Sequence, residues 1–330
     1  MKRILTLTIN PAIDASCSVE TVFPDHKLRS GPVCHEPGGG GVNVSRAIRN
    51  LRGESTVFYV SGGPSGQMLG LLLDREGLIH EAIIVEDWTR ENLTVTERTS
   101  GAEYRFVTPG PNLRTEEWEG CLARISALDP MPDFVVASGS LPPGAPMDFY
   151  GRLAKIVSAG KSRFVLDSSG AALTECLRSS KVYLTKPSVR ELSGVVGREL
   201  VGDEGPEEAA MDIVKAGQAQ IVVVSLGAAG ALLVTANGPE RIPAPVVPVK
   251  SKVGAGDSMV AGIVLGLARE MAIRDAVCLG IACGSATVMM PGTQLCQRKD
   301  VERLFIQITG RHKMHGNSQL LQCEIGLPTA

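Results

Sequence analysis

The sequence predicts an α/β fold in which a mainly parallel sheet is covered by helices and carries a small, separate group of strands. Three observations predict it. Short aliphatic runs alternate with segments of helical length over the first two-thirds of the chain. Only helical patterns follow residue 245, and two β-branched excursions interrupt the alternation. Glycine accounts for 37 of 330 residues and aromatic residues for 4%, which suits tight turns and sites lined by backbone.

Six runs of β-branched and aliphatic residues are expected to form buried strands. Segments of helical length separate most of them, as parallel strands require, because a tight turn cannot join two parallel strands. The strands are predicted at Arg3–Ile9, Thr56–Ser61, Phe134–Ala137, Arg163–Leu166, Val182–Leu184 and Ile221–Ser225, and the helices at Val42–Leu51, Gly66–Glu76, Glu116–Leu128, Met147–Ser158 and Pro206–Ala216 and near residues 257–270, 274–290 and 298–309.

Two excursions outside this alternation are predicted to form a small β lid. Residues Cys17–Cys34 and Asn92–Val107 each suggest a short hairpin, and Ser100–Gly101 divides the second into Leu93–Arg98 and Glu103–Val107. Lids of this kind close over bound substrates. We therefore expect one α/β domain over residues 1–310, with its lid at about residues 12–35 and 90–108, and a polar tail over residues 311–330.

Composition excludes several classes of protein. The formal net charge is −2, from 33 basic and 35 acidic residues, whereas binding to nucleic-acid phosphates needs a basic surplus. No run approaches the ~18–20 apolar residues that span a bilayer, and Met1–Asn10 is typical of a strand rather than of a secretion signal. The eight cysteines form no CxxC pair, and the five histidines show no metal-binding spacing. We expect a cytoplasmic enzyme with reduced thiols and with no nucleic-acid or membrane partner.

The strongest local motif is Val253–Ser258, a glycine turn that runs directly into the apolar segment Met259–Ala268. Glycines before a helix let backbone N–H groups converge on an anion at the positive end of the helix. Asp257 would then stand beside a bound phosphate, where it could take a proton from an attacking hydroxyl. The alternative is an ordinary aspartate at the start of a helix, with no ligand.

A run of four glycines, Gly38–Gly41, opens another predicted helix. We interpret it as bare backbone that a small polar ligand can approach, with Asn43 in the first turn able to bind sugar hydroxyls. A flexible linker is the alternative. Two lid arginines, Arg90 and Arg105, could clamp a phosphate from neighbouring strands, although arginines on a hairpin are also commonly just solvated.

Polar loops follow several predicted strands, where open α/β sheets bind their ligands. They are Ser138–Gly144, Lys186–Glu191 and Ser225–Gly227. The sequence contains no GxxxxGK[ST] motif, no GxGxxG after a strand and no GxSxG, so it predicts neither a P-loop, nor a dinucleotide site, nor a serine hydrolase.

Taken together, these segments resemble the ribokinase-like (PfkB) family of sugar kinases from Leu5 to about Ile308. The resemblance implies a three-layer α/β/α sandwich with a β lid, and commonly a homodimer formed through lid strands. It is carried by Asn10–Asp14, Gly38–Asn43, Trp88–Arg90, Tyr104–Phe106, Gly139–Gly144, Asp167–Gly170 and Gly254–Asp257.

The resemblance also implies roles for individual residues. Asp257 matches the catalytic base that deprotonates the 1-hydroxyl of the sugar, and the amides of Gly254, Ala255 and Gly256 match the anion hole for the transferred γ-phosphoryl group. Glu191 matches the acidic residue that organises Mg²⁺ bound with ATP. The family positions that hold the sugar hydroxyls are matched by Asp14, Gly39 and Asn43. The positions around the sugar phosphate and between the two substrates are matched by Arg90, Arg105, Ser140 and Lys27. The positions on the nucleotide side are matched by Lys186, Ser188, Ser225, Gly227 and Gly230.

Four positions depart from the family pattern. Ser188 stands where the family's N-x-x-E motif has asparagine, Ser251–Lys252 replaces the usual acidic–threonine pair before the glycine turn, and Gln294 replaces an arginine. That pair commonly contributes to a monovalent-cation site, so dependence on K⁺ is left open. Gly40, where relatives acting on other ketohexose phosphates usually have lysine, favours fructose 6-phosphate as the substrate. The alternatives are a tagatose-6-phosphate or fructose-1-phosphate kinase, or a catalytically weak sugar-phosphate sensor.

Overall fold

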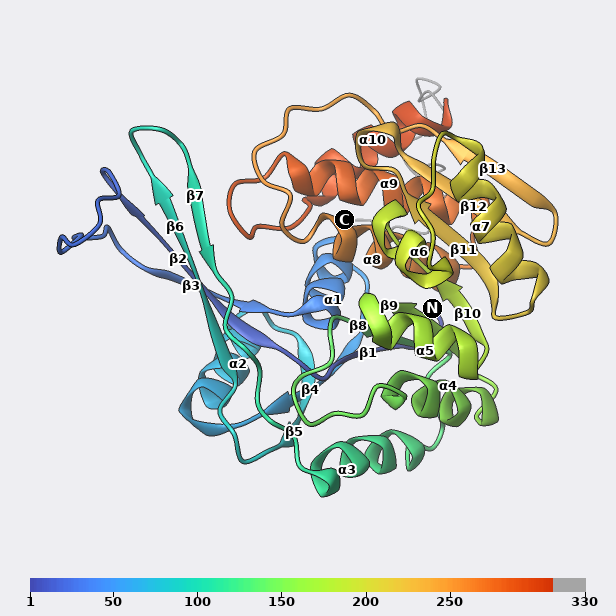
Figure 1. Ribbon diagram of the computed structural model, residues 1–330, viewed down its shortest axis with the longest axis horizontal. Helices are drawn as coiled ribbons and strands as arrows, with labels where there is room; N and C mark the ends of the chain where they lie inside the picture. Colours follow the sequence, from blue (N-terminus) through green and yellow to red (C-terminus); the bar gives the residue numbers. More distant parts are fainter. Residues whose placement is uncertain (311–330) are drawn as a thin grey trace.

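The computed structural model describes residues 1–310, and the predicted tail at 311–330 lies outside them. A nine-stranded sheet forms the centre of the molecule, in the order β13-β12-β11-β10-β9-β8-β1-β4-β5 (Figure 1). The strands from β5 to β11 along this order are parallel, and only β12 and β13 are antiparallel. The bounds are β1 Ile4–Thr8, β4 Thr56–Ser61, β5 Ile79–Ile84, β8 Phe134–Ser138, β9 Arg163–Asp167, β10 Val182–Thr185, β11 Ala219–Ser225, β12 Ala231–Thr235 and β13 Gly238–Ile242.

All six predicted strands are confirmed, and the sequence analysis missed β5, β12 and β13. Strand β5 is the half-exposed edge of the sheet, so its sequence IHEAII mixes polar and apolar residues and shows no buried run. Strands β12 and β13 form a hairpin, and the Asn237–Gly238 pair at its turn is a signal that could have identified it.

Helices cover both faces of the sheet, as expected. Neighbouring strand residues alternate between the two layers: Ile4 and Val136 pack with one helical cluster, and Leu5 and Val135 with the other. The first cluster contains α1 (Gly40–Asn50), α8 (Ala255–Ala268), α9 (Ile273–Val288) and α10 (Arg298–Thr309); the second contains α3 (Thr115–Ser126), α4 (Phe149–Ala159), α5 (Gly170–Ser179), α6 (Val189–Val196) and α7 (Glu204–Lys215), and α2 (Gly63–Arg75) packs near the β5 edge. Only α5 and α6 were not predicted.

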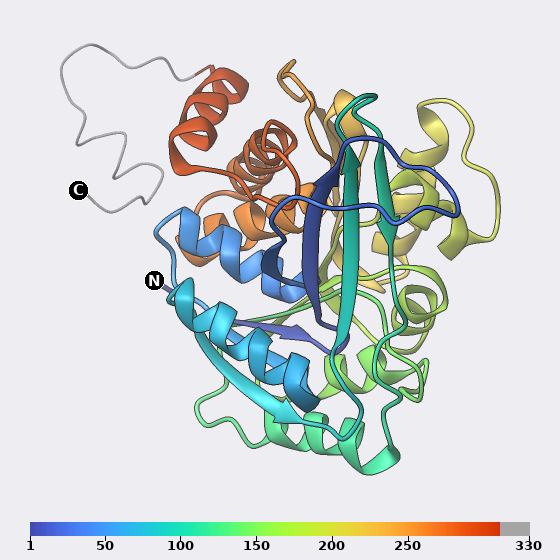
Figure 2. The same ribbon diagram turned by 90° about the vertical axis from the view of Figure 1, so that its left-hand side faces the viewer.

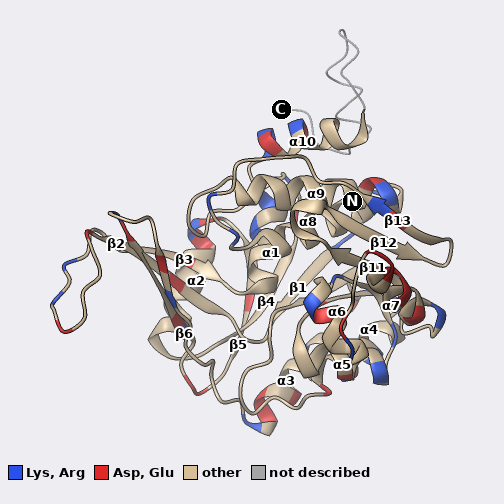
Figure 3. Cartoon of the chain, turned by 45° about the horizontal axis from the view of Figure 1, so that its top comes forward, with Lys and Arg blue, Asp and Glu red and all other residues tan. Residues whose placement is uncertain are grey.

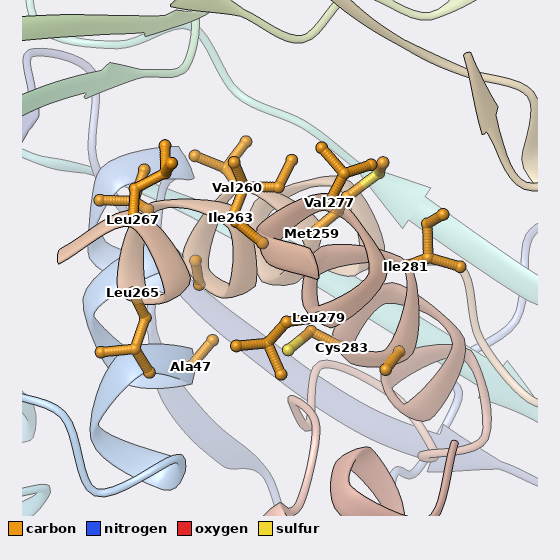
Figure 4. Packing of buried hydrophobic residues seen from close by; sticks show 14 of the residues in the cluster. Ala47, Met259, Val260, Ile263, Leu265, Leu267, Val277, Leu279, Ile281 and Cys283 are labelled. Atoms are coloured by element: carbon orange, nitrogen blue, oxygen red, sulfur yellow. The ribbon is translucent and has the colours of Figure 1, made fainter. Parts of the chain in front are cut away.

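Helix α8 lies at the centre of its layer, and its residues from Ser258 to Ala268 are buried. Figure 4 shows its side chains packed between α9 and α1. The approach to α9 is close because glycines meet there: a Cβ on Gly262 would lie 2.8 Å from the Cα of Gly280 and 2.7 Å from Sγ of Cys283. The hydrophobic effect therefore fixes the position of α8 and of the turn at its N-terminus.

The lid is a second sheet with the order β3-β2-β6-β7, and it projects from one side of the main body (Figures 1 and 2). The hairpin of β6 (Arg90–Glu97) and β7 (Glu103–Phe106) is confirmed. The expected hairpin within Cys17–Cys34 is wrong, because the strands lie further out, at β2 (Ala12–Val19) and β3 (Cys34–Gly38). The segment between them forms a loop, since Pro24 and Pro32 lack the backbone N–H that a ladder needs.

No helix among residues 1–310 is long and apolar enough to cross a membrane. Figure 3 shows lysine and arginine interspersed with aspartate and glutamate over the outer helices and the lid. The charge balance of the sequence is thus spread over the described surface rather than concentrated in one part of it.

Candidate active site

The carboxyl ends of the central strands and the N-termini of α1 and α8 meet at one edge of the main sheet. Strand β8 ends at Ser138, β9 ends at Asp167, and Lys186 follows β10 directly. Asn43 lies in the first turn of α1 and Asp257 in the first turn of α8. Side chains from five separate segments therefore converge where ligands bind in open α/β sheets.

Asp257 is half-buried and held by two neighbours. Nδ2 of Asn43 donates to its Oδ2 at 2.9 Å, and Oγ of Ser138 lies 3.5 Å from its Oδ1. Burial, followed by the negative charge of Asp167, raises the pKa of Asp257 to about 6, although Asn43 and Lys186 oppose the rise. A carboxylate with this pKa is ionised at neutral pH yet more basic than an ordinary aspartate, which suits a general base.

Lys186 is buried beside this carboxylate and forms an ion pair with Asp167, with 3.2 Å between Nζ and Oδ1. Burial lowers the pKa of the lysine, but the charges of Asp167, Glu191 and Asp257 outweigh burial and raise it overall. The ammonium group thus stays charged. It also lies near the start of α8, since a Cβ on Gly256 would be 3.5 Å from its Nζ.

The turn before α8 has the conformation that an anion site needs. Gly254 caps the helix in the left-handed region, with φ of +72°, and a Cβ there would lie 2.5 Å from Leu295. The amides of Ala255 and Gly256 follow at the positive end of the helix. With Lys186 nearby, this corner of the site favours negative charge.

The glycine run Gly38–Gly41 has a different reason from the one we expected. Helix α1 begins at Gly40 rather than later, and Gly38 belongs to β3. A Cβ on Gly40 would lie 2.3 Å from Oγ of Ser138, and one on Gly41 would lie 2.6 Å from the carbonyl oxygen of Leu7. These glycines let α1 start against the ends of β1 and β8, and that contact places Asn43 beside Asp257. Gly39 joins them at a φ of +111°.

The lid contributes a polar face above this edge. Asn92 of β6 donates to Oδ1 of Asp14 of β2 at 2.8 Å. Arg90 donates to the carbonyl oxygens of Asn10 at 3.0 Å and Pro11 at 3.3 Å, and its burial lowers its pKa. Arg90 therefore also fastens the lid to the end of β1, a structural role that the sequence did not indicate.

Two asparagines in this region were given no role by the sequence analysis. Nδ2 of Asn10 donates to Oγ of Ser140 at 3.1 Å, while its Oδ1 is buried without a hydrogen-bond partner. Asn92 of β6 lies opposite Asp14 of β2, so Asn92 could have been identified only by recognising that these two strands pair in parallel. Both lie next to residues expected to bind the sugar.

Two expected phosphate ligands are not in contact with the Asp257 cluster. Arg105 is exposed on β7, where its register partner Thr94 places it on the same face of the lid as Asp14 and Asn92. Lys27 is exposed and belongs to the loop between β2 and β3, and this loop forms the outer end of the lid (Figure 1). The described chain thus brings Arg105 onto the lid face of Asp14 and Asn92, and it leaves Lys27 in the outer loop.

The residues expected to bind the nucleotide follow β10 and β11. Ser188 caps α6, and Glu191 accepts hydrogen bonds from its backbone nitrogen at 2.7 Å and its hydroxyl at 2.9 Å. The amide of Ser225 donates to the carbonyl oxygen of Pro187 at 2.9 Å, which joins the two loops. Gly227 begins a short 3₁₀ turn that ends at Gly230. Serine at position 188 therefore completes a capping box with Glu191.

Within residues 1–310, no three histidine, cysteine, aspartate or glutamate side chains cluster as metal ligands. Asp167 and Glu191 are both close enough to Lys186 to act on its charge. At the segment before α8, Ser251 is buried and its Oγ accepts the amide of Val253 at 3.2 Å, whereas Lys252 is exposed. A divalent ion would thus have one or two carboxylates here and would need further ligands from a substrate or water.

The chain is similar to known proteins over most of its length. Residues 6–300 match the family model described as pfkB family carbohydrate kinase. The ATP-dependent 6-phosphofructokinase isozyme 2 of Mycobacterium tuberculosis is 44% identical over 303 residues, which cover 92% of this chain and 89% of that protein. The crystal structure of phosphofructokinase-2 from Escherichia coli in complex with potassium has a TM-score of 0.90 at 38% identity, and it covers 94% of this chain and 100% of that chain. The same enzyme in complex with fructose-6-phosphate has a TM-score of 0.87 at 37% identity and the same coverage of both chains.

Proposed function

The chain belongs to the pfkB family of carbohydrate kinases, and on that premise we propose that it is an ATP-dependent 6-phosphofructokinase. It transfers the γ-phosphoryl group of ATP to the 1-hydroxyl of fructose 6-phosphate and releases fructose 1,6-bisphosphate and ADP. The observation that carries the proposal is the carboxylate of Asp257, with its pKa of about 6, at the N-terminus of α8 and beside the buried Lys186. The two similar proteins named above have the same activity in their names.

In the proposed reaction Asp257 is the general base. It accepts the proton of the 1-hydroxyl as that oxygen forms a bond to the γ-phosphorus, while the bond from the γ-phosphorus to the β,γ-bridging oxygen breaks and leaves ADP. Asn43 holds one carboxylate oxygen, Oδ2, at 2.9 Å, whereas Oδ1 has only the longer 3.5 Å contact with Oγ of Ser138, so we assign Oδ1 as the acceptor for this proton. General-base assistance of this kind contributes about 10²–10⁴-fold to the rate.

Charge on the transferred group is met by the start of α8 and by Lys186. The amides of Ala255 and Gly256 follow the left-handed turn at Gly254 and form the anion hole in this proposal. Lys186 supplies a permanent positive charge, because its ion pair with Asp167 keeps it protonated. Ser188, Ser225, Gly227 and Gly230 line the loops that we assign to the nucleotide.

The family implies ATP with a divalent metal, and we propose Mg²⁺. Mg²⁺ is commonly held by one or two carboxylates together with substrate phosphates and water, which agrees with Glu191 and Asp167 near Lys186. When bound with ATP, it neutralises phosphate charge.

On the sugar side we assign Asp14, Gly39 and Asn43 to the hydroxyls of the substrate. Arg90, Arg105, Ser140 and Lys27 are assigned to the 6-phosphate and to the region between the substrates. The shared face of Asp14, Asn92 and Arg105 supports this assignment, because it sets a carboxylate and a guanidinium on one face of the lid. Lys27 needs a movement of its loop, or a second subunit, to reach a substrate.

We also propose a homodimer through the lid. The lid face opposite to Asp14 is apolar: Leu93 pairs with Phe106 and Val95 pairs with Tyr104. Phe106 is 58% exposed, and Leu93 and Tyr104 are also exposed. A second lid would remove this apolar surface from water. A cytoplasmic location is part of the proposal, because none of the seven cysteines within residues 1–310 forms a disulfide.

A coupled ADP assay with purified protein tests the function. Fructose 6-phosphate, tagatose 6-phosphate and fructose 1-phosphate are compared at equal concentration, each with and without K⁺. We expect fructose 6-phosphate to be the preferred acceptor, and Asp257→Asn to lose about 10²–10⁴-fold in kcat with the fold intact. Turnover of the other sugars without fructose 6-phosphate would contradict the proposal. Thermal stabilisation by fructose 6-phosphate without ATP turnover would instead support a sugar-phosphate sensor.

A further inference from the structure

The side chain of Arg46 is buried in α1, yet it belongs to no part of the mechanism described above. It is 6% exposed and makes hydrogen bonds with each of its three nitrogens. Nε donates to the carboxylate of Glu76 at 2.9 Å, and Nη2 lies 3.1 Å from Oε1 of Glu36. Burial of a guanidinium is costly unless it is fully paired, so this arrangement has to be specific.

The partners of Arg46 come from different parts of the fold. Glu36 belongs to lid strand β3, and Glu76 caps the end of α2. Glu36 also accepts a hydrogen bond from Oγ1 of Thr293, in the loop that follows α9. Arg46 thus lies where the lid, α1, α2 and the loop before α10 meet.

Nη1 of Arg46 donates to the carbonyl oxygen of Pro37 at 3.0 Å and also faces Asn43, which is one helical turn earlier and holds Asp257. Nη1 of Arg46 lies 3.4 Å from Oδ1 of Asn43, and Nδ2 of Asn43 lies 2.9 Å from Oδ2 of Asp257. Arginine has only donors, so the amide atom that faces it must be the oxygen. The amide nitrogen is then left to face the carboxylate, which has only acceptors when it is ionised.

We propose that Arg46 is a positioning residue for phosphoryl transfer: it fixes the amide of Asn43 with its nitrogen toward Asp257 and ties that orientation to the lid through Glu36. The inference rests on the proposed role of Asp257 as the base. With the amide fixed, Oδ2 of Asp257 is engaged, and Oδ1, which has only the 3.5 Å contact with Oγ of Ser138, remains for the hydroxyl proton. Without Arg46 the amide of Asn43 can rotate, and its oxygen would then face the carboxylate.

The pH dependence of the rate separates this role from a merely structural one. Asp257 is surrounded by Asp167 of β9, Lys186 after β10, Ser138 of β8 and Asn43 of α1. Of these, Asn43 is the partner that Arg46 touches, and its hydrogen bond lowers the pKa of Asp257 against the effects of burial and of Asp167. Loss of that hydrogen bond raises the pKa of the base, so the acid limb of the kcat profile moves to higher pH.

The test is Arg46→Lys, which keeps the charge but not the planar set of donors. We expect kcat to fall roughly 10- to 100-fold, the acid limb to move to higher pH and the dissociation constant of fructose 6-phosphate to stay within a few-fold. The matched control is Arg49→Lys. Arg49 lies on the same helix, but its side chain donates to the carbonyl oxygen of Gly77, next to Glu76, rather than to Asn43. The control should leave both kcat and its pH profile unchanged.

A double-mutant cycle tests the route through Asn43. If Arg46 acts through that amide, adding Arg46→Lys to Asn43→Ala causes little further loss of kcat. The proposal would be overturned if the two substitutions lowered kcat multiplicatively. It would also be overturned if the acid limb of the kcat–pH profile stayed at the wild-type position in Arg46→Lys. Glu36→Gln replaces Arg46→Lys if the latter does not fold, and should move the acid limb in the same direction by less. An active Asp257→Asn would instead overturn the role of Asp257 as the base, on which this inference rests, whereas the substrate panel above tests the proposed function itself.

Discussion

Replacing Asp257 with asparagine should stabilise the substrate-free protein at neutral pH. Burial and then the charge of Asp167 raise the pKa of Asp257 from 3.8 to about 6. A carboxyl group whose folded-state pKa lies above its unfolded value opposes folding once the pH exceeds the unfolded value, because the folded protein then binds the proton more tightly than the unfolded chain. Asparagine removes this charge and retains an acceptor for Asn43. The residue proposed as the base is therefore a site where function costs stability.

The size of the effect follows from the pKa. A rise of about two pKa units corresponds to about 3 kcal/mol at a pH above both values. Because the carboxylate of Asp257 is only half-buried, we expect about 1–3 kcal/mol in the free energy of unfolding at pH 8. The difference should shrink below pH 6 and vanish below about pH 4, where the carboxyl group is protonated in both states.

Urea and thermal unfolding of both proteins at pH 8 and pH 4.5, without nucleotide or sugar, measure this difference. Asp212→Asn, at an exposed position of α7, is the matched control and should change stability by less than about 0.5 kcal/mol. A gain for Asp257→Asn that is equal at both pH values would refute the electrostatic origin. A loss of stability at pH 8 would show that the charged carboxylate is net favourable in the fold.

Three further predictions concern the core, the lid and the segment before α8. Gly262→Ala should destabilise the protein by about 1–3 kcal/mol in thermal unfolding, because its Cβ would meet Cys283 at 2.7 Å; Gly120→Ala, with open space around it in α3, should instead stabilise by about 0.4–1 kcal/mol. Arg105→Ala should raise KM for fructose 6-phosphate about 10- to 100-fold and leave KM for ATP nearly unchanged in steady-state assays; equal changes in both constants would argue against a phosphate contact. Initial rates of the wild type should be equal in K⁺ and Na⁺, because the positive charge of Lys252 repels a monovalent cation from the segment before α8. Lys252→Thr should introduce stimulation by K⁺. Strong stimulation of the wild type by K⁺ would contradict this role of Lys252.

Most of the main sheet could be predicted from the sequence, because its central strands are buried on both faces and appear as continuous apolar runs. Strand β5 could not, since an exposed edge lacks that run. Helices α5 and α6 were missed because each is short, and α6 has only Leu192 fully buried. Strand β2 alternates apolar and polar residues from Ile13 to Val19, but its partner β3, with the sequence CHEPG, carries no such pattern, so the β2–β3 pair was misplaced.

The site was predictable as a set of loops but not as a set of contacts. Asn43 and Asp257 are 214 positions apart, so no local pattern joins them. The glycine run was recognised as special, but its reason is the packing of α1 against Leu7 and Ser138, which only the tertiary structure shows. Arg46 looks in the sequence like any charged residue on a helix, and its burial depends on two acidic residues from other elements.

The pairing of β2 with β6 has a consequence for how the protein assembles during synthesis. Asp14 and Asn92 are partners in a parallel strand pair and are 78 positions apart in the sequence. The segment from β3 to β5 must therefore be synthesised before β6 can pair with β2. Contacts of such separation form late, because their loop-closure entropy has to be overcome first. Residues 254–257 emerge from the ribosome last of all the site segments. The residues assigned to the sugar, Asp14, Gly39 and Asn43, can thus be present on a nascent chain that still lacks the proposed base and anion hole.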